Sequence, residues 1–140
     1  MCNFFSCIVT KDKVQTVYGV DSHDDLIELL GLKSKDNANR VDLVRIEVTP
    51  PTDGPMTLDF EKWHYKVDQD ILPDWYVAEI DKQRVLDFMR TLPAITDDVD
   101  SFAGQAYFCT ARVGRLFAQG FIRMVFGSAQ IAHVCGSAQI

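Results

Sequence analysis

A repeat of nine residues in the last third of the chain constrains the fold more than any other feature. In register, the tail reads GRLFAQGFI, RMVFGSAQI and AHVCGSAQI, and the last two copies share the letters GSAQI. Three columns of similar residues align: Val113, Ile122, Ile131 and Ile140; Leu116, Val125 and Val134; and the small residues Ala111, Gly120, Ala129 and Ala138. A fixed period is typical of architectures in which each unit buries its apolar side chains against the next unit. The repeat therefore predicts a short β-solenoid over residues 101–140.

The period leaves the geometry of this segment open. Nine residues suit one side of a two-sided coil or one segment of a larger coil, and a β-rich tail without coiling is the alternative. Calcium-binding β-rolls need an aspartate at a fixed place in each repeat, and no aspartate follows Asp100. No polar cap follows Ile140, so we expect this end to associate with other copies in a closed homo-oligomer.

Residues 1–100 have the pattern of a compact domain with both strands and helices. Residues 2–10 and 14–20 are β-prone and predict a hairpin, and alternation over residues 41–48 and 58–67 predicts two more strands. A first helix is expected between a cap at Asp21 or Ser22 and a stop at Gly31, and a second from Asp74 to Leu92. The predicted fold class is α+β: an antiparallel sheet with two helices in residues 1–100, followed by the solenoid in residues 101–140.

Composition narrows the range of partners. A net charge of −6 and an isoelectric point near 4.9 oppose the electrostatic attraction that DNA, RNA or anionic lipid would need. No stretch approaches the roughly 20 apolar residues of a membrane-spanning helix. The four cysteines show no CxxC spacing and no signal peptide is recognisable, so we expect a cytoplasmic protein with reduced thiols, no metal and no cofactor.

Aromatic and arginine side chains provide the best material for a ligand site. The candidate ligand-binding residues are Arg45, Trp63, Tyr65, Trp75, Arg112, Arg115 and Arg123. Trp63 and Tyr65 precede the PDW turn and Trp75 ends it. Arg45 lies on the neighbouring predicted strand, and the other three arginines lie in the predicted solenoid. An aromatic plane can stack on a base, and a guanidinium can bind a phosphate. We therefore expect a small nucleotide ligand, and the alternative is that the aromatics are core and the arginines are solvated or paired with residues 97–100.

Signals for catalysis or metal binding are weaker. His23, His64 and His133 have no HxxxH spacing and no matched cysteine, so surface or capping roles are expected. The chain has no P-loop, GxGxxG or GxSxG motif. Removal of the initiator Met would make Cys2 an N-terminal nucleophile with its own amine as base, and MCNFFS is similar to the start of some N-terminal nucleophile hydrolases and SRAP proteins. Burial of Cys2 in the first strand is the alternative, and we predict no catalytic residue and no enzymatic activity.

Five segments together resemble a group of small phage and prophage proteins: MCNFFSCIVT, DSHDDLIELLGL, VRIEVTPP, KVDQDILPDW and the GSAQI tail. The chain is also similar to viral sponge proteins that sequester cyclic nucleotide immune signals, such as the anti-CBASS sponges. That resemblance implies an oligomer that binds a small nucleotide without cleaving it and so evades host immunity, and it assigns no site residue. A structural or protein-interaction module, presenting the repeats to a host or virion partner, is the alternative from another class.

Overall fold

The computed structural model describes residues 4–17, 19–37, 40–51, 58–117, 120–125 and 129–140. The chain divides into two compact units. The first comprises Met1–Thr52 and Asp59–Arg90, and the second comprises Asp53–Leu58 and Thr91–Ile140. The division after residue 90 precedes the boundary predicted after residue 100.

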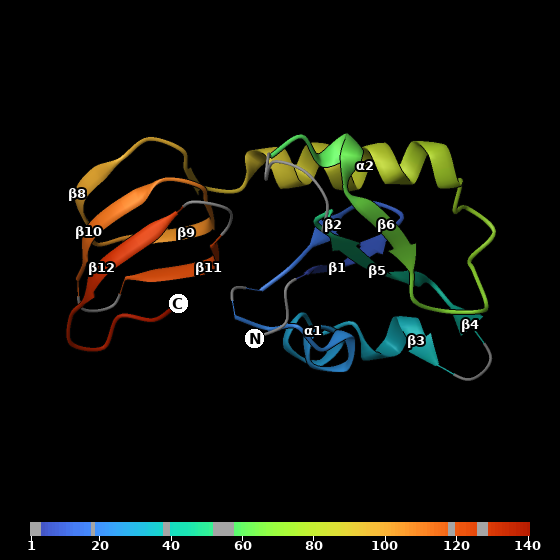
Figure 1. Ribbon diagram of the computed structural model, residues 1–140. Coiled ribbons are helices and arrows are strands. Elements are labelled where there is room, and N and C mark those ends of the chain that lie inside the picture. The colour runs from blue at the N-terminus through green and yellow to red at the C-terminus, as the bar shows by residue number, and fades with distance from the viewer. Residues whose placement is uncertain (1–3, 18, 38–39, 52–57, 118–119, 126–128) are drawn as a thin grey trace. The chain divides into compact units, whose positions relative to one another are not determined.

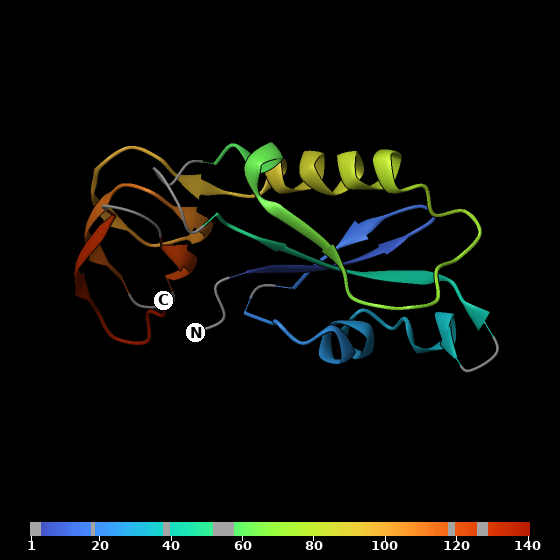
Figure 2. The same ribbon diagram turned by 45° about the vertical axis from the view of Figure 1, so that its right-hand side comes forward.

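The first unit is built on a four-stranded antiparallel sheet (Figure 1). Its strands lie in the order β2 (Val14–Gln15), β1 (Phe5–Thr10), β5 (Leu43–Thr49) and β6 (His64–Val67). Figures 1 and 2 show helix α1 (His23–Leu29) on one face of this sheet and helix α2 (Ala78–Thr91) on the other. The remaining elements are the 3-10 turns η1 (Lys33–Lys35) and η2 (Phe60–Lys62) and the short pair β3 (Asp36–Asn37) and β4 (Arg40–Val41).

The position of each strand in the sheet explains its sequence pattern. All six residues of β1 are buried, because this central strand is covered on both faces, and its sequence is correspondingly a continuous run rather than an alternation. β5 alternates as predicted: Val44, Ile46 and Val48 are buried, while Arg45 and Glu47 on the opposite face are partly exposed. The face that carries Arg45 is the α1 face, because its neighbour across the sheet, Ile8, packs with Leu26 and Ile27 of α1.

The two helices are fixed by identifiable capping interactions. Ser22 caps α1, since its side-chain oxygen accepts a hydrogen bond from the Asp25 N–H at 3.3 Å, and Gly31 follows the helix with a φ of 69° that favours glycine. Both features were predicted. α2 begins at Ala78, so the predicted start at Asp74 is wrong. The Asp81 carboxylate supplies the cap instead, accepting the N–H of Val77 at 2.8 Å.

The second unit consists of two three-stranded parallel sheets that take strands alternately along the chain. One sheet contains β7 (Ala94–Ile95), β9 (Gln105–Cys109) and β11 (Phe121–Val125), and the other contains β8 (Val99–Phe102), β10 (Arg112–Leu116) and β12 (Gln130–Val134). Buried residues from both sheets form a single apolar cluster: Ile95, Ala106, Cys109, Ala111, Val113, Leu116 and Ile122. Apolar residues of the repeat therefore form the core of this unit.

The structure gives the nine-residue period a definite geometry, which the sequence left open. Val113 pairs with Ile131, two repeats further along, whereas Ile122 pairs with Ala106 in the other sheet. Residues nine apart thus belong to opposite sheets and do not stack in one ladder. The small-residue column has a steric cause at Gly120, where an added Cβ would lie 2.7 Å from Cδ1 of Leu116.

The predicted fold class, α+β with a C-terminal solenoid, is wrong. About 39% of the described structure is strand: beside two α-helices, ten strands form three larger sheets and β3 and β4 form a separate pair, so the described structure is mostly β. The repeat segment is two parallel sheets, not a closed solenoid. The predicted hairpin is present as β1–β2 and the two further predicted strands pair as β5–β6, but β2 covers only Val14–Gln15 and β6 only His64–Val67, with η2 where strand was predicted. The second helix starts four residues after its predicted beginning. Within the part of the chain that the structure describes, no helix has the length and apolar character needed to cross a bilayer.

Candidate functional site

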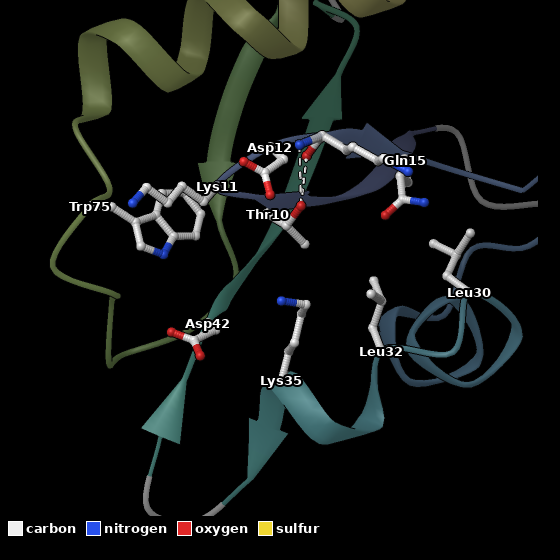
Figure 3. Close-up of a pocket in the computed structure, with 10 residues that line it drawn as sticks. Thr10, Lys11, Asp12, Gln15, Leu30, Leu32, Lys35, Asp42 and Trp75 are labelled. Carbon is white, nitrogen blue, oxygen red and sulfur yellow. Dashed lines mark hydrogen bonds between the residues drawn. The ribbon is translucent and has the colours of Figure 1, made fainter.

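A cavity of about 440 Å³ opens at the turn between β1 and β2 in the first unit (Figure 3). Its size lies within the range of small-molecule sites, roughly 300–1,000 Å³. Ten residues line it: Thr10, Lys11, Asp12, Lys13, Gln15, Leu30, Leu32, Lys35, Asp42 and Trp75. Three lysines face this one cavity, in a chain whose net charge is −6. Asp12 and Asp42 also line it, so this lysine cavity keeps a small excess of positive charge on an acidic protein.

Hydrogen bonds at the base of the turn position the first two lysines. The N–H of Thr10 donates to the carbonyl oxygen of Lys13 at 2.8 Å, and the N–H of Lys13 donates to the Thr10 hydroxyl oxygen at 3.2 Å. These bonds close the hairpin, so Lys11 and Asp12 stand at its exposed tip. Arg84 of α2 holds the same strand end, because its Nη2 donates to the carbonyl oxygen of Thr10 at 3.0 Å.

The third lysine and the acidic residue Asp42 come from the segment that follows α1. In Figure 3, Lys35 extends from η1 toward the β1–β2 turn. The backbone fixes its position, since the Asp42 N–H donates to the Lys35 carbonyl oxygen at 2.8 Å. Lysines that are far apart in sequence therefore reach one cavity from two separate turns, where their ammonium groups can bind an anion.

Trp75 supplies the aromatic side of the cavity. It lies in the connection between β6 and α2, is partly exposed, and packs edge-on against Tyr76 with ring centroids 6.5 Å apart. Tyr76 in turn shares a hydrogen bond of 3.1 Å between its hydroxyl and that of Tyr65. Burial raises the pKa of Tyr65, and the bond to Tyr76 raises it further, so both phenols are neutral at physiological pH. The Trp75 indole thus packs against Tyr76, which forms an uncharged hydrogen-bonded pair with Tyr65.

The structure brings only one of the seven predicted residues, Trp75, to this cavity. Trp63 is buried with 4% exposure and contacts Phe60 edge-on at 5.0 Å, so it belongs to the core. Tyr65 lies opposite Val48 on the α2 side of the sheet, whereas Arg45 lies on the α1 side. The guanidinium of Arg45 binds Asp36 with Nη2 and Oδ2 at 2.6 Å. Arg45 and Tyr65 are therefore not brought together.

The three arginines of the repeats do not form one cluster either. Arg112 and Arg115 are exposed on β10, and Arg112 lines a cavity of about 620 Å³ over the β8–β10–β12 sheet. The backbone N–H of Arg112 donates to a carboxylate oxygen of Asp98 at 2.9 Å. Arg123 is on β11 in the other sheet and is only 6% exposed. Arg112 and Arg115 are therefore accessible to a ligand in solution, whereas Arg123 is buried.

Sequence reasoning missed the lysines of the cavity and misjudged His23. Nothing in the sequence connects Lys11 and Lys13 with Lys35, because their common cavity depends on how η1 folds back along the sheet. His23 was expected at the surface or in a capping role, but it is 8% exposed and makes two hydrogen bonds, to Asp68 and to the carbonyl of Ile46. The available sequence signal for a buried role of His23 was its position: it is the first residue of α1 and lies two residues after Asp21.

Two of the three described cysteines, Cys7 and Cys109, are poor nucleophiles. Burial raises the pKa of the Cys7 thiol and that of the Cys109 thiol, which disfavours the reactive thiolate. Cys2, the predicted alternative nucleophile, lies outside the described residues. Among the residues that the structure describes, no cysteine, serine or histidine lines the lysine cavity. Its groups are suited to holding an anion and an aromatic ring.

Comparison with protein-family models, with curated proteins and with solved structures found no match.

Proposed function

We propose that the protein binds a small anionic ligand with an aromatic ring, of the nucleotide class, in the cavity at the β1–β2 turn and does not cleave it. The observation that carries this proposal is the meeting of Lys11, Lys13, Lys35 and Trp75 around one cavity of about 440 Å³.

The chemistry of the cavity matches the parts of a nucleotide. Lysine ammonium groups bind phosphate as point charges, and a base stacked on an indole contributes about 1–3 kcal/mol. Asp12, Gln15 and Asp42 add acceptors and an amide donor for sugar hydroxyls or the edge of a base. The local positive charge also favours this small anion over a long polyanion, because the rest of the acidic chain repels extended nucleic acid.

The resemblance to phage proteins and to nucleotide sponges extends the proposal. A sponge needs tight binding without turnover, and a lining without a cysteine, serine or histidine fits that requirement. We accordingly propose a cyclic nucleotide immune signal as the ligand, a homo-oligomer as the assembly, and the host cytoplasm as the location. Sedimentation of the purified chain tests the assembly, and fractionation of infected cells tests the location.

The alternative function is a structural or protein-interaction module, and one observation favours it. The second unit, which contains the repeats, has three large apolar residues at its surface: Phe117, Val134 and Ile140 are 41%, 49% and 42% exposed. β12 is an end strand of its sheet, with β10 as its neighbour. An exposed strand edge with apolar side chains is a surface on which another chain can pair.

Native mass spectrometry with cyclic di- and trinucleotides and ADP-ribose derivatives tests the ligand, with the released ligand then analysed for cleavage. We expect one nucleotide to be retained and returned intact. Trp75→Leu and Lys35→Gln should each weaken binding by about 5- to 150-fold, since loss of one stacking or charged contact costs about 1–3 kcal/mol. Lys62→Gln is the matched control, because Lys62 lies in η2, does not line the cavity, and is 74% exposed.

Failure to retain any nucleotide, or return of a cleaved product, contradicts the proposal. Binding that survives both cavity variants places the ligand elsewhere on the protein. Specific capture of a host or virion protein that depends on Val134, without nucleotide binding, favours the interaction module.

A further inference from the structure

Three side chains capable of binding a metal converge on the α1 face of the first unit. They are His23, the first residue of α1; Glu47 of β5; and Asp68, which follows β6. One nitrogen or oxygen atom from each lies within 4.8 Å of the others. The three residues also line a cavity of about 520 Å³ that is separate from the lysine cavity and shares no lining residue with it.

The hydrogen bonds of His23 define where its protons are. Nε2 lies 3.0 Å from the carbonyl oxygen of Ile46. A carbonyl oxygen only accepts, so Nε2 carries a hydrogen. Nδ1 lies 3.1 Å from Oδ2 of Asp68. In a neutral imidazole this nitrogen has a lone pair and no hydrogen, so it would face an electron-rich carboxylate oxygen. A positive charge between the two atoms, either a proton or a metal ion, makes the contact attractive.

The same arrangement is the one found around metal-binding histidines. Such a histidine donates its other ring N–H to a backbone carbonyl or carboxylate, which fixes the ring and its tautomer. The Ile46 carbonyl has this role toward His23, and burial of the ring to 8% exposure keeps Nδ1 directed at Asp68. The imidazole is therefore oriented as a ligand before any ion arrives.

Charges around the cluster also favour a cation. Asp21 and Asp24 line the cavity together with Glu47 and Asp68. Arg45 is the cation on the same lining, and its guanidinium is held by Asp36 at 2.6 Å and lies 3.7 Å from Asp24. Its positive charge is therefore offset by these two carboxylates.

Lys66 is the competing cation. Its Nζ lies 4.0 Å from Oε2 of Glu47 and 3.8 Å from Oδ1 of Asp68. The side chain is 55% exposed, so it can turn to solvent when a doubly charged ion takes its place. The ammonium thus occupies the electrostatic minimum that a metal ion would use.

We propose that His23 Nδ1, Glu47 and Asp68 bind a divalent first-row transition-metal ion, with manganese as the best-matched probe. One imidazole and two carboxylates form a mixed set that suits Mn²⁺ and Zn²⁺, whereas Ca²⁺ and Mg²⁺ prefer oxygen alone. With bonds of about 2.0–2.2 Å, ligand atoms in such a site lie roughly 3.0–3.5 Å apart. The ligand atoms now lie within 4.8 Å of one another, and rotation of the partly exposed Glu47 and Asp68 side chains brings them to this shorter spacing. Three protein ligands leave positions for water, because the cavity is open to solvent.

Equilibrium dialysis of the full, EDTA-treated chain against Mn²⁺, with metal counted by mass spectrometry and bound Mn²⁺ followed by electron paramagnetic resonance, tests the site. Manganese is preferred to zinc because the chain has four cysteines, whose thiolates bind zinc. We expect one Mn²⁺ per chain. Asp68→Asn and Glu47→Gln should each weaken binding by at least tenfold, and Lys66→Gln should strengthen it by removing the competing ammonium.

His64→Gln is the matched control, since His64 is an exposed histidine on β6 outside the cluster. It should leave Mn²⁺ binding unchanged. His23→Gln should abolish binding; where circular dichroism shows that this buried change unfolds the chain, the two carboxylate variants decide the question. Absence of stoichiometric Mn²⁺, or binding that is equal in Asp68→Asn, Glu47→Gln and the unaltered protein, overturns the proposal.

Discussion

Two aspartate–arginine pairs on α2 offer a test of how burial changes the contribution of an ion pair to the free energy of unfolding. Asp81 and Arg84 lie three residues apart with Oδ1 and Nη1 at 2.7 Å, and Asp87 and Arg90 repeat the same spacing at 2.8 Å. The pairs differ in exposure: the aspartate side chain is 5% exposed in the first and 63% in the second. The spacing is the same and the distance nearly the same in both pairs, but the further contacts differ: Asp81 also accepts the N–H of Val77, whereas Asp87 accepts the side-chain amide of Gln83. A difference in stability between variants therefore reports burial together with these contacts.

Asp81→Ala should lower the free energy of unfolding of the first unit by about 3 kcal/mol. It removes the helix cap on Val77, worth about 1 kcal/mol, and a hydrogen bond to a charged group, worth about 1.5–3 kcal/mol. It also leaves Arg84, whose side chain is 29% exposed, without its carboxylate. Asp87→Ala should cost no more than about 0.5 kcal/mol, since exposed pairs are screened by solvent.

Urea denaturation followed by tryptophan fluorescence measures both variants. The chain has two tryptophans, Trp63 and Trp75, and both lie in the first unit, so the signal reports that unit alone. Asp81→Asn should fall between the two alanine variants, because it keeps one acceptor but loses the charge. Equal losses for Asp81→Ala and Asp87→Ala would refute the larger contribution assigned to the buried Asp81 carboxylate and its cap on Val77.

Two further predictions concern the core and alkaline pH. Gly120→Ala should destabilise the second unit by about 1–3 kcal/mol, because its Cβ would lie 2.7 Å from Leu116 Cδ1 and 2.9 Å from the Phe117 carbonyl oxygen; an unchanged thermal midpoint by circular dichroism would contradict it. Burial raises the pKa of the Cys7 thiol above its ordinary 9.0. The free energy of unfolding is therefore highest below pH 9 and should fall by about 1.4 kcal/mol for each pH unit above it. Tyr65, which is partly exposed, should add a smaller loss above pH 10. Urea titrations at pH 8 and 10.5 should show a weaker dependence in Cys7→Ala than in the unaltered protein.

The local elements that were predictable are those whose signals lie close together in sequence. The alternation of β5, the Ser22 cap and the Gly31 stop each depend on neighbouring residues, and the structure contains all three. The start of α2 was placed too early because Asp74 is a good cap in isolation. The actual capping carboxylate, Asp81, lies inside the helix and acts backward on Val77.

Most of the candidate sites were not predictable because they depend on which face of a strand meets which helix. Alternation placed Arg45 and Glu47 on one side of β5, but it could not assign that side to α1 rather than to α2. His23 and Asp68 lie 45 positions apart and meet only because β6 pairs with β5. The resemblance to phage proteins likewise carries no contact information, and it stays a prediction.

Because successive repeats alternate between two sheets, an odd and an even number of repeats give different structures. Each added or deleted copy of nine residues moves the chain end from one sheet to the other, and only a pair of copies returns it to the same edge. The final copy illustrates the rule, since Gln139 bridges to Phe121 beside β11 rather than to β12. Because the last two copies share GSAQI, gain of a single further copy would add a strand to one sheet only and so change which sheet holds the last strand.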